Sequence, residues 1–202
     1  MHGNTQLLFE RYARGYFPPG VKVLEVGPDH PSTLQAMANV PDTQWHTVDL
    51  AGADGASATY HARDEYTFPI ADDTYDVVVA ANVLEHVRKV WVWIRELARV
   101  CRPGGHVILI SPVSWPYHEF PIDCWRAYPE GMQALYDEAG LTVVLNRCEA
   151  LEDAHLRRHV PGRSLAYIYD HETWRMKLAT RVFAALGFPV ERPHDTITIG
   201  RK

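Results

Sequence analysis

Cysteine is scarce in this chain of 202 residues, and the few cysteines present stand far apart. Cys101, Cys124 and Cys148 are odd in number and form no closely spaced pair. A disulfide framework and a zinc ribbon both need paired cysteines, so neither is expected. Unpaired cysteines fit a reducing compartment, which favours a cytoplasmic location.

Long apolar runs and an excess of one charge are missing as well. A membrane-spanning helix needs about 18 consecutive apolar residues, and no such run occurs. The N-terminal stretch has no basic start followed by an apolar core, so a secretion signal is not expected. A formal net charge of −5 and a pI near 6.1 provide no field that attracts nucleic acid or an anionic membrane. We therefore expect a small-molecule partner, neutral or cationic, and leave a homodimer open.

Apolar residues are plentiful, at 47% of the chain, which is enough for one domain with a sizeable core. Short apolar runs alternate with helical patterns. Strands are predicted at 21–26, 45–50, 75–81, 106–113, 141–148 and 195–202, with a weak extended piece at 59–62. Helices are predicted at 32–38, 91–100, 129–140 and 172–186. This alternation predicts an α/β fold with a parallel sheet, in which ligands bind at the carboxyl ends of the strands.

The turn after the first predicted strand carries acids where a nucleotide-binding loop carries glycines. Only Gly27 remains of a three-glycine fingerprint, and Glu25 and Asp29 would place negative charge beside a pyrophosphate. S-adenosylmethionine has a ribose, an adenine, an ammonium and a sulfonium but no phosphate, so it suits an acidic edge. Asp49, at the end of the second strand, stands where an acid accepts ribose hydroxyls. The alternative is that Glu25 and Asp29 are only turn and cap residues.

Four motifs occur in order over residues 21–112: "VLEVGP", "HTVDL", "FPIADDTYDVVVAANVLEHV" and "IRELARVCRPGGHVILISP". Together they resemble the successive motifs of class I S-adenosylmethionine-dependent methyltransferases of the type 11 kind. The resemblance implies a Rossmann-like, seven-stranded, mostly parallel sheet with helices on both faces. The terminal "DTITIGRK" would be its last, antiparallel strand, and residues 1–202 would form a single domain.

The resemblance also implies positions for the cofactor. Glu25 and Gly27 would flank its methionine part, and Asp49 with Leu50 would hold the ribose. The remaining cofactor-binding positions are Asp64 and Glu65 at the adenine, and Ala81, Asn82 and Leu84 at the methionine end.

Two departures from the family pattern concern this site. The family commonly has a second glycine two residues after Gly27, and this chain has Asp29 there, preceded by Pro28. The stretch before Asp64 is also a poor strand, so the adenine contacts are less secure than the ribose contacts.

Acceptor binding is predicted in two segments, 111–130 and 149–193. The first is dense in aromatic, proline and polar residues and follows the fifth strand. Its aromatic content predicts an acceptor with a ring or a sugar. The predicted acceptor-binding residues are Trp115, Tyr117, Trp125 and Arg126.

His118 is the candidate catalytic base of the first segment, because imidazole titrates near neutrality. Asp123 would orient it or bind acceptor hydroxyls. In the alternative interpretation, His118 and Asp123 only tie the loop to the domain while the aromatic residues pack as its small core. His86 in "LEHV" is a second candidate near the cofactor, although a structural role at a helix start is the stronger interpretation.

No metal site is predicted. His155 and His159 stand four residues apart, but the neighbouring arginines at 157 and 158 oppose a cation. The sequence therefore predicts a methyltransferase that uses S-adenosylmethionine on a small molecule, with oxygen the favoured acceptor atom, in natural-product or sugar biosynthesis. A cofactor-binding module without catalysis is the first alternative, and a nicotinamide-dependent oxidoreductase is the second.

Overall fold

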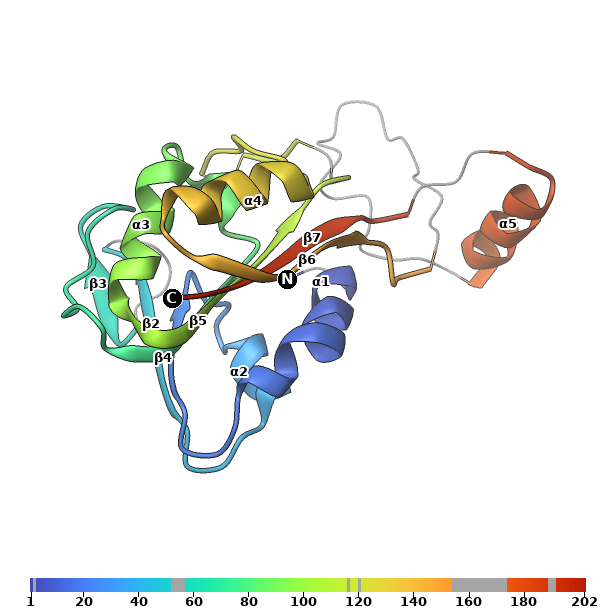
Figure 1. The fold of residues 1–202 in the computed structure, drawn as a ribbon. Coiled ribbons are helices and arrows are strands. Elements are labelled where there is room, and N and C mark those ends of the chain that lie inside the picture. The colour runs from blue at the N-terminus through green and yellow to red at the C-terminus, as the bar shows by residue number, and fades with distance from the viewer. Residues whose placement is uncertain (2, 52–56, 116, 120, 154–173, 189–191) are drawn as a thin grey trace.

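A computed structural model of the chain describes all residues except 2, 52–56, 116, 120, 154–173 and 189–191 (Figure 1). Seven strands form one sheet in the order β3-β2-β1-β4-β5-β7-β6. The strands are β1 (Lys22–Val26), β2 (Gln44–Leu50), β3 (Tyr60–Ala62), β4 (Tyr75–Ala81), β5 (Cys101–Pro112), β6 (Thr142–Glu149) and β7 (Asp195–Arg201). Only β7 runs antiparallel to its neighbours, as the resemblance predicted.

Helices cover both faces of this sheet (Figure 1). One face carries α3 (Val90–Val100) and α4 (Pro129–Glu138), and the other carries α1 (Gly3–Leu8), the π-helical η1 (Phe9–Ala13) and α2 (Thr33–Ala38). The short 3-10 helices are η2 (Arg14–Tyr16) and η3 (Leu84–His86), and α5 (Trp174–Ala185) lies near the C-terminus. The predicted α/β architecture is confirmed.

The central strand β4 shows why the pattern predicted the sheet so well. Its run "YDVVVAA" alternates between the two faces: Tyr75 and Val78 belong to one apolar core, and Val77 and Val79 to the other. When helices cover both faces of a sheet, the side chains on both faces of a central strand are buried, so such a strand is apolar throughout. The chain passes from β1 to β2 on one side and returns through β4 on the other, which creates the crevice where such sheets bind ligands.

The two tryptophans of α3 differ in burial. Both tryptophans of "VWVWIREL" fit core packing by composition, but only Trp93 is buried. Trp91 is 45% exposed, and its ring meets the Trp125 ring edge to face with 6.1 Å between centroids. Residues two apart on a helix lie about 200° apart around the axis, so both cannot face the same sheet.

Among the described residues, no helix is long and apolar enough to cross a membrane.

Candidate functional site

The parallel strands β1, β2, β4 and β5 end at one edge of the sheet, and the candidate site lies there. Each of these strands runs directly into a turn or loop that carries residues singled out in the sequence. The site can therefore be followed strand by strand from β1 to β5.

Glu25 on β1 lies in the sheet interior rather than on an open rim. It is 2% exposed, and its Oε2 accepts hydrogen bonds from Ser32 Oγ at 2.5 Å and from Trp45 Nε1 at 2.7 Å. Burial raises the pKa of Glu25, and these two hydrogen bonds oppose the rise. Ser32 in turn caps α2 by accepting from the backbone N–H of Gln35. The carboxyl group thus joins β1, β2 and the start of α2.

The β1 turn depends on Gly27. Its φ is +63°, and a Cβ placed there would lie 2.7 Å from Cγ2 of Val83 in the turn after β4. Its backbone N–H donates to Val48 O at 3.0 Å. Asp29, in the position of the missing family glycine, accepts from Thr33 Oγ1 at 3.1 Å. The turn therefore brings bare backbone close to the crevice, as ligands of this edge require.

The acids beyond β1 form a series along the same edge. Asp49 is half-buried at the end of β2, and its Oδ1 accepts from the backbone N–H of Leu50 at 2.7 Å. Asp64 is exposed two residues beyond β3 and accepts from the backbone N–H of Tyr66 at 2.8 Å. Oε1 of Glu65 lies 3.3 Å from Nη1 of Arg88. Asp49 lies at the end of β2, whereas Asp64 and Glu65 are neighbours in the segment after β3, and each acid has a local partner.

After β4 the chain makes a sharp turn into η3. Asn82 has a φ of +57°, and its backbone N–H donates to Ile110 O of β5 at 2.9 Å. Leu84 points into the core, whereas Glu85 and His86 approach the loop that follows β5. The backbone N–H of Cys124 donates to Glu85 O at 2.7 Å, which anchors the loop over η3.

Asp123 organises this loop. Arg126 donates to both oxygens of the Asp123 carboxylate, and the backbone N–H of His118 donates to Oδ2 at 2.8 Å. Burial alone would raise the pKa of Asp123, but the hydrogen bonds from Arg126 and His118 hold this pKa below its ordinary value. Asp123 therefore stays ionised. The His118 ring lies beside it, with Nδ1 at 3.4 Å from Oδ2.

The predicted acceptor residues occupy the same loop but differ in exposure. Trp125 donates from Nε1 to Val87 O at 2.8 Å, and Arg126 also donates from Nε to Trp115 O at 3.3 Å. Tyr117 is 62% exposed, and its hydroxyl donates to Glu119 at 2.5 Å. These contacts support loop packing, which was the alternative interpretation, and they leave the aromatic faces of Tyr117 and Trp125 partly open.

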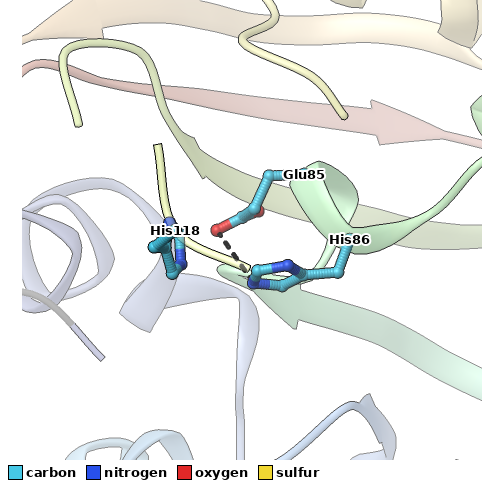
Figure 2. Close-up of side chains that lie close together, drawn as sticks. All are labelled: Glu85, His86 and His118. Carbon is cyan, nitrogen blue, oxygen red and sulfur yellow. Dashed lines mark ion pairs between the residues drawn. The ribbon is translucent and has the colours of Figure 1, made fainter. Parts of the chain in front are cut away.

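One functional candidate was missed in the sequence. Glu85 is completely buried beside His86 and His118, and the three side chains converge in Figure 2. Burial raises the pKa of Glu85 to about 8. The available signal was the acid in "LEHV", since the position directly after a buried parallel strand lies at the ligand edge. The histidine pair His155 and His159 lies outside the described residues.

Part of the chain is similar to known methyltransferases. Residues 24–109 match a family model described as a methyltransferase domain. The chain is 35% identical over 106 residues to an uncharacterized methyltransferase of Mycobacterium ulcerans, covering 48% of this chain and 41% of that protein. An uncharacterized methyltransferase of Mycobacterium avium is 33% identical over 98 residues, covering 48% of this chain and 34% of that protein. Over about half of its length the chain is therefore similar to methyltransferases, as the sequence motifs predicted.

Solved structures of two methyltransferases and of a cyclase share the fold of nearly the whole chain. A S-adenosylmethionine-dependent methyltransferase from Archaeoglobus fulgidus superposes with a TM-score of 0.61 at 14% identity, over 98% of this chain and 92% of that one. A phosphoethanolamine N-methyltransferase from Haemonchus contortus, solved with S-adenosylhomocysteine, superposes with a TM-score of 0.61 at 14% identity. The superposition covers 98% of this chain and 52% of that one. The [4+2]-cyclase SpnF superposes with a TM-score of 0.63 at 18% identity, over 98% of this chain and 80% of that one. The likeness to these structures concerns the fold, because identities are this low.

The residues at this edge fit S-adenosylmethionine, the cofactor of the solved methyltransferases that share the fold. The close approach of Gly27 to Val83 leaves no room for a side chain at the crevice between β1 and β4. Asp49 is the second-last residue of β2 and lies at the same edge of the sheet. The chain spans about two fifths of the length of the curated relatives it matches.

Proposed function

We propose that this methyltransferase transfers a methyl group from S-adenosylmethionine to a small-molecule acceptor, with oxygen the favoured acceptor atom. The observation that carries this proposal is the position of His118. An imidazole held beside an ionised Asp123 lies over the turn that follows β4, where the family places the methionine end of the cofactor.

The cofactor supplies an activated methyl carbon, and the chain supplies alignment. Asp49 would accept hydrogen bonds from the ribose hydroxyls, with Leu50 beside it. Gly27, Ala81, Asn82 and Leu84 would shape the methionine end, and Glu25 would hold the turn that contacts it. Asp64 and Glu65 would meet the adenine.

His118 would accept the proton that an acceptor hydroxyl loses during transfer. Asp123 would orient the imidazole and stabilise its protonated form, as carboxylates do beside catalytic histidines. Arg126 would hold Asp123 in place and bring its positive charge near an acceptor carboxylate or phosphate. The ring faces of Trp115, Tyr117 and Trp125 would pack against an acceptor with a ring or a sugar.

The first experiment is isothermal titration of the full chain with S-adenosylmethionine and, separately, with NAD. We expect binding of S-adenosylmethionine that weakens at least tenfold in Asp49→Asn, because one ionised acceptor of the ribose hydroxyls is lost. Binding of NAD without a response to S-adenosylmethionine would instead favour the oxidoreductase alternative.

The second experiment follows methyl transfer from radiolabelled S-adenosylmethionine to a broad acceptor panel. We expect His118→Gln and Asp123→Asn to lower kcat by about 10²–10⁴-fold without changing cofactor affinity. The matched control is His106→Gln, since His106 lies in the middle of β5, six residues before the strand ends at Pro112, and pairs with Arg201. Unchanged turnover in His118→Gln would remove the base assignment. Cofactor binding without turnover on any acceptor would favour the non-catalytic module.

A further inference from the structure

The cluster formed by buried Glu85 and half-buried His86 and His118 is not explained by the proposed function alone. Each residue offers one ligand atom, and these three atoms lie within 4.8 Å of one another (Figure 2). The first two residues belong to η3 and the third to the loop after β5, so the cluster joins segments about 30 residues apart in the chain. Such convergence calls for a physical reason.

His86 has the tautomer that a metal ligand requires. Its Nδ1 lies 2.5 Å from the backbone carbonyl of Ile122. A carbonyl oxygen only accepts hydrogen bonds, so Nδ1 carries the proton and Nε2 keeps its lone pair. Nε2 lies 3.9 Å from Oε1 of Glu85. A histidine that donates one ring N–H to a carbonyl and turns the other nitrogen toward a carboxylate has the usual arrangement of a metal-bound histidine.

The His118 ring lies beside a fixed carboxylate, although its Nδ1 makes no hydrogen bond to the described residues. Oδ2 of Asp123 lies 3.4 Å from its Nδ1 and also accepts the backbone N–H of His118. Arg126 fixes the Asp123 carboxylate from the other side. The ring meets that of His86 edge to face, with 5.0 Å between centroids. A carboxylate behind a histidine is the common second layer of a metal site, because it fixes the orientation of the ring.

Glu85 provides the independent observation. Its side chain is 0% exposed, and neither carboxylate oxygen has a hydrogen-bond partner among the described residues. Among the charges around it, Arg126 favours the ionised form of Glu85, whereas Asp123 and Asp195 disfavour it. An unpartnered buried carboxylate is costly, and either a bound proton or a bound cation relieves the cost. The two histidine nitrogens beside it favour the cation.

We propose that Glu85, His86 and His118 bind a divalent transition-metal ion. Two imidazole nitrogens and one carboxylate suit zinc, manganese, iron(II) or cobalt(II), whereas calcium prefers an all-oxygen site. Metal–ligand bonds of about 2.1 Å require the three ligand atoms to move closer together than their present separation. The side chains can do this by rotating, since none of the three ligand atoms is held by a hydrogen bond to another described residue.

The remaining coordination positions would take water or oxygen atoms of the acceptor. The acceptor part of this statement rests on the proposed function, whereas cation binding does not. With the cation bound, His118 serves as a ligand, and the cation lowers the pKa of the acceptor hydroxyl instead. Without the cation, His118 is free to act as the base.

The test is titration of the full chain, first dialysed against a chelator, with Zn²⁺, Mn²⁺ and Ca²⁺ in the absence of S-adenosylmethionine. We expect one equivalent of Zn²⁺ or Mn²⁺ to bind, with at most weak binding of Ca²⁺. Glu85→Gln, His86→Gln and His118→Gln should each weaken binding at least tenfold, and Asp123→Asn should do so by about 10–100-fold through the orientation of His118. His106→Gln is the control and should bind as the parent does. Absence of binding, or unchanged binding in Glu85→Gln, would overturn the proposal.

Cobalt(II) provides a readout that does not depend on the variants folding. The parent protein should show weak visible absorption typical of nitrogen and oxygen ligands. Cys124 is exposed, and its backbone lies beside Glu85. An intense near-ultraviolet band from a thiolate ligand would therefore show a different ligand set and overturn the assignment. S-adenosylmethionine titration of the same chelated sample separates the two proposals: cofactor binding without metal binding refutes only this inference, and the converse refutes only the proposed function.

Discussion

Replacement of Gly27 by alanine tests the geometry of the cofactor crevice directly. Two effects act together at this position. The backbone φ of +63° is unfavourable for any residue with a Cβ, at about 1–2 kcal/mol. The new Cβ would also lie 2.7 Å from Cγ2 of Val83, well inside the ordinary carbon–carbon contact of about 3.5–4.0 Å.

Relief of that contact requires the turn after β4 to move. Overpacking of this kind costs about 1–3 kcal/mol, so we expect a total loss of about 3 kcal/mol in the free energy of unfolding. For a chain of this length the loss corresponds to a fall of about 6–12 °C in Tm. Because the β1 and β4 turns line the same crevice, about half of the effect should appear in cofactor affinity as roughly a tenfold increase in Kd for S-adenosylmethionine.

The assay combines thermal unfolding with isothermal titration of S-adenosylmethionine. Gly27→Ala/Val83→Ala should recover the contact part of the loss but retain the backbone part, which a double-mutant cycle measures. Gly131→Ala is the control, because Gly131 lies in α4 and a Cβ there would meet nothing within 4 Å. That change should be neutral or stabilise the helix by up to about 1 kcal/mol. Parent-like Tm and Kd in Gly27→Ala would refute the reasoning.

Two further predictions concern buried polar groups away from the crevice. Asp195 is 1% exposed and accepts from Asn4, and burial raises its pKa to about 6. Because this folded-state pKa exceeds the unfolded value near 3.8, the contribution of Asp195 to stability is fully present below about pH 4 and is lost as the pH rises through 6, by about 3 kcal/mol. Asp195→Asn should remove this loss. The measurement is the free energy of unfolding in urea at pH 4.5 and at pH 7 for the parent and the variant. An equal change between the two pH values in both proteins would contradict the assignment. Tyr136 is completely buried, and its hydroxyl donates to Thr198 O at 2.9 Å and Val107 O at 3.3 Å. Tyr136→Phe should lower the free energy of unfolding by about 1 kcal/mol in urea, and an unchanged midpoint would show that these hydrogen bonds contribute nothing net.

Much of the fold could be predicted because its signals are local. The apolar run of β4 and the terminal "DTITIGR" were recognisable as strands from a few residues each, and the structure forms both. Ser32 was placed at the start of a helix and does cap α2. Burial on both faces of a sheet leaves an apolar run in the sequence wherever it occurs.

The candidate site could be predicted only in part, because its contacts join distant segments. Glu25 was expected at an open acidic rim, yet Trp45 and Ser32 bind its carboxyl group inside the sheet edge. Glu85 was passed over because its lack of partners depends on a loop that begins more than 20 residues later. Neither the sequence around Glu85 nor the sequence of the loop after β5 contains a pattern that predicts this contact.

What the sequence determined by itself is the order of strands and helices, the crevice edge where a ligand binds, and the motifs that identify the cofactor. These follow from hydrophobic period and turn chemistry, which act over a few residues. Tertiary structure alone decided that Gly27 faces Val83 and that Glu85, His86 and His118 converge. Such contacts are set by the packing of whole elements against one sheet, and side-chain burial follows from that packing rather than from the local chain.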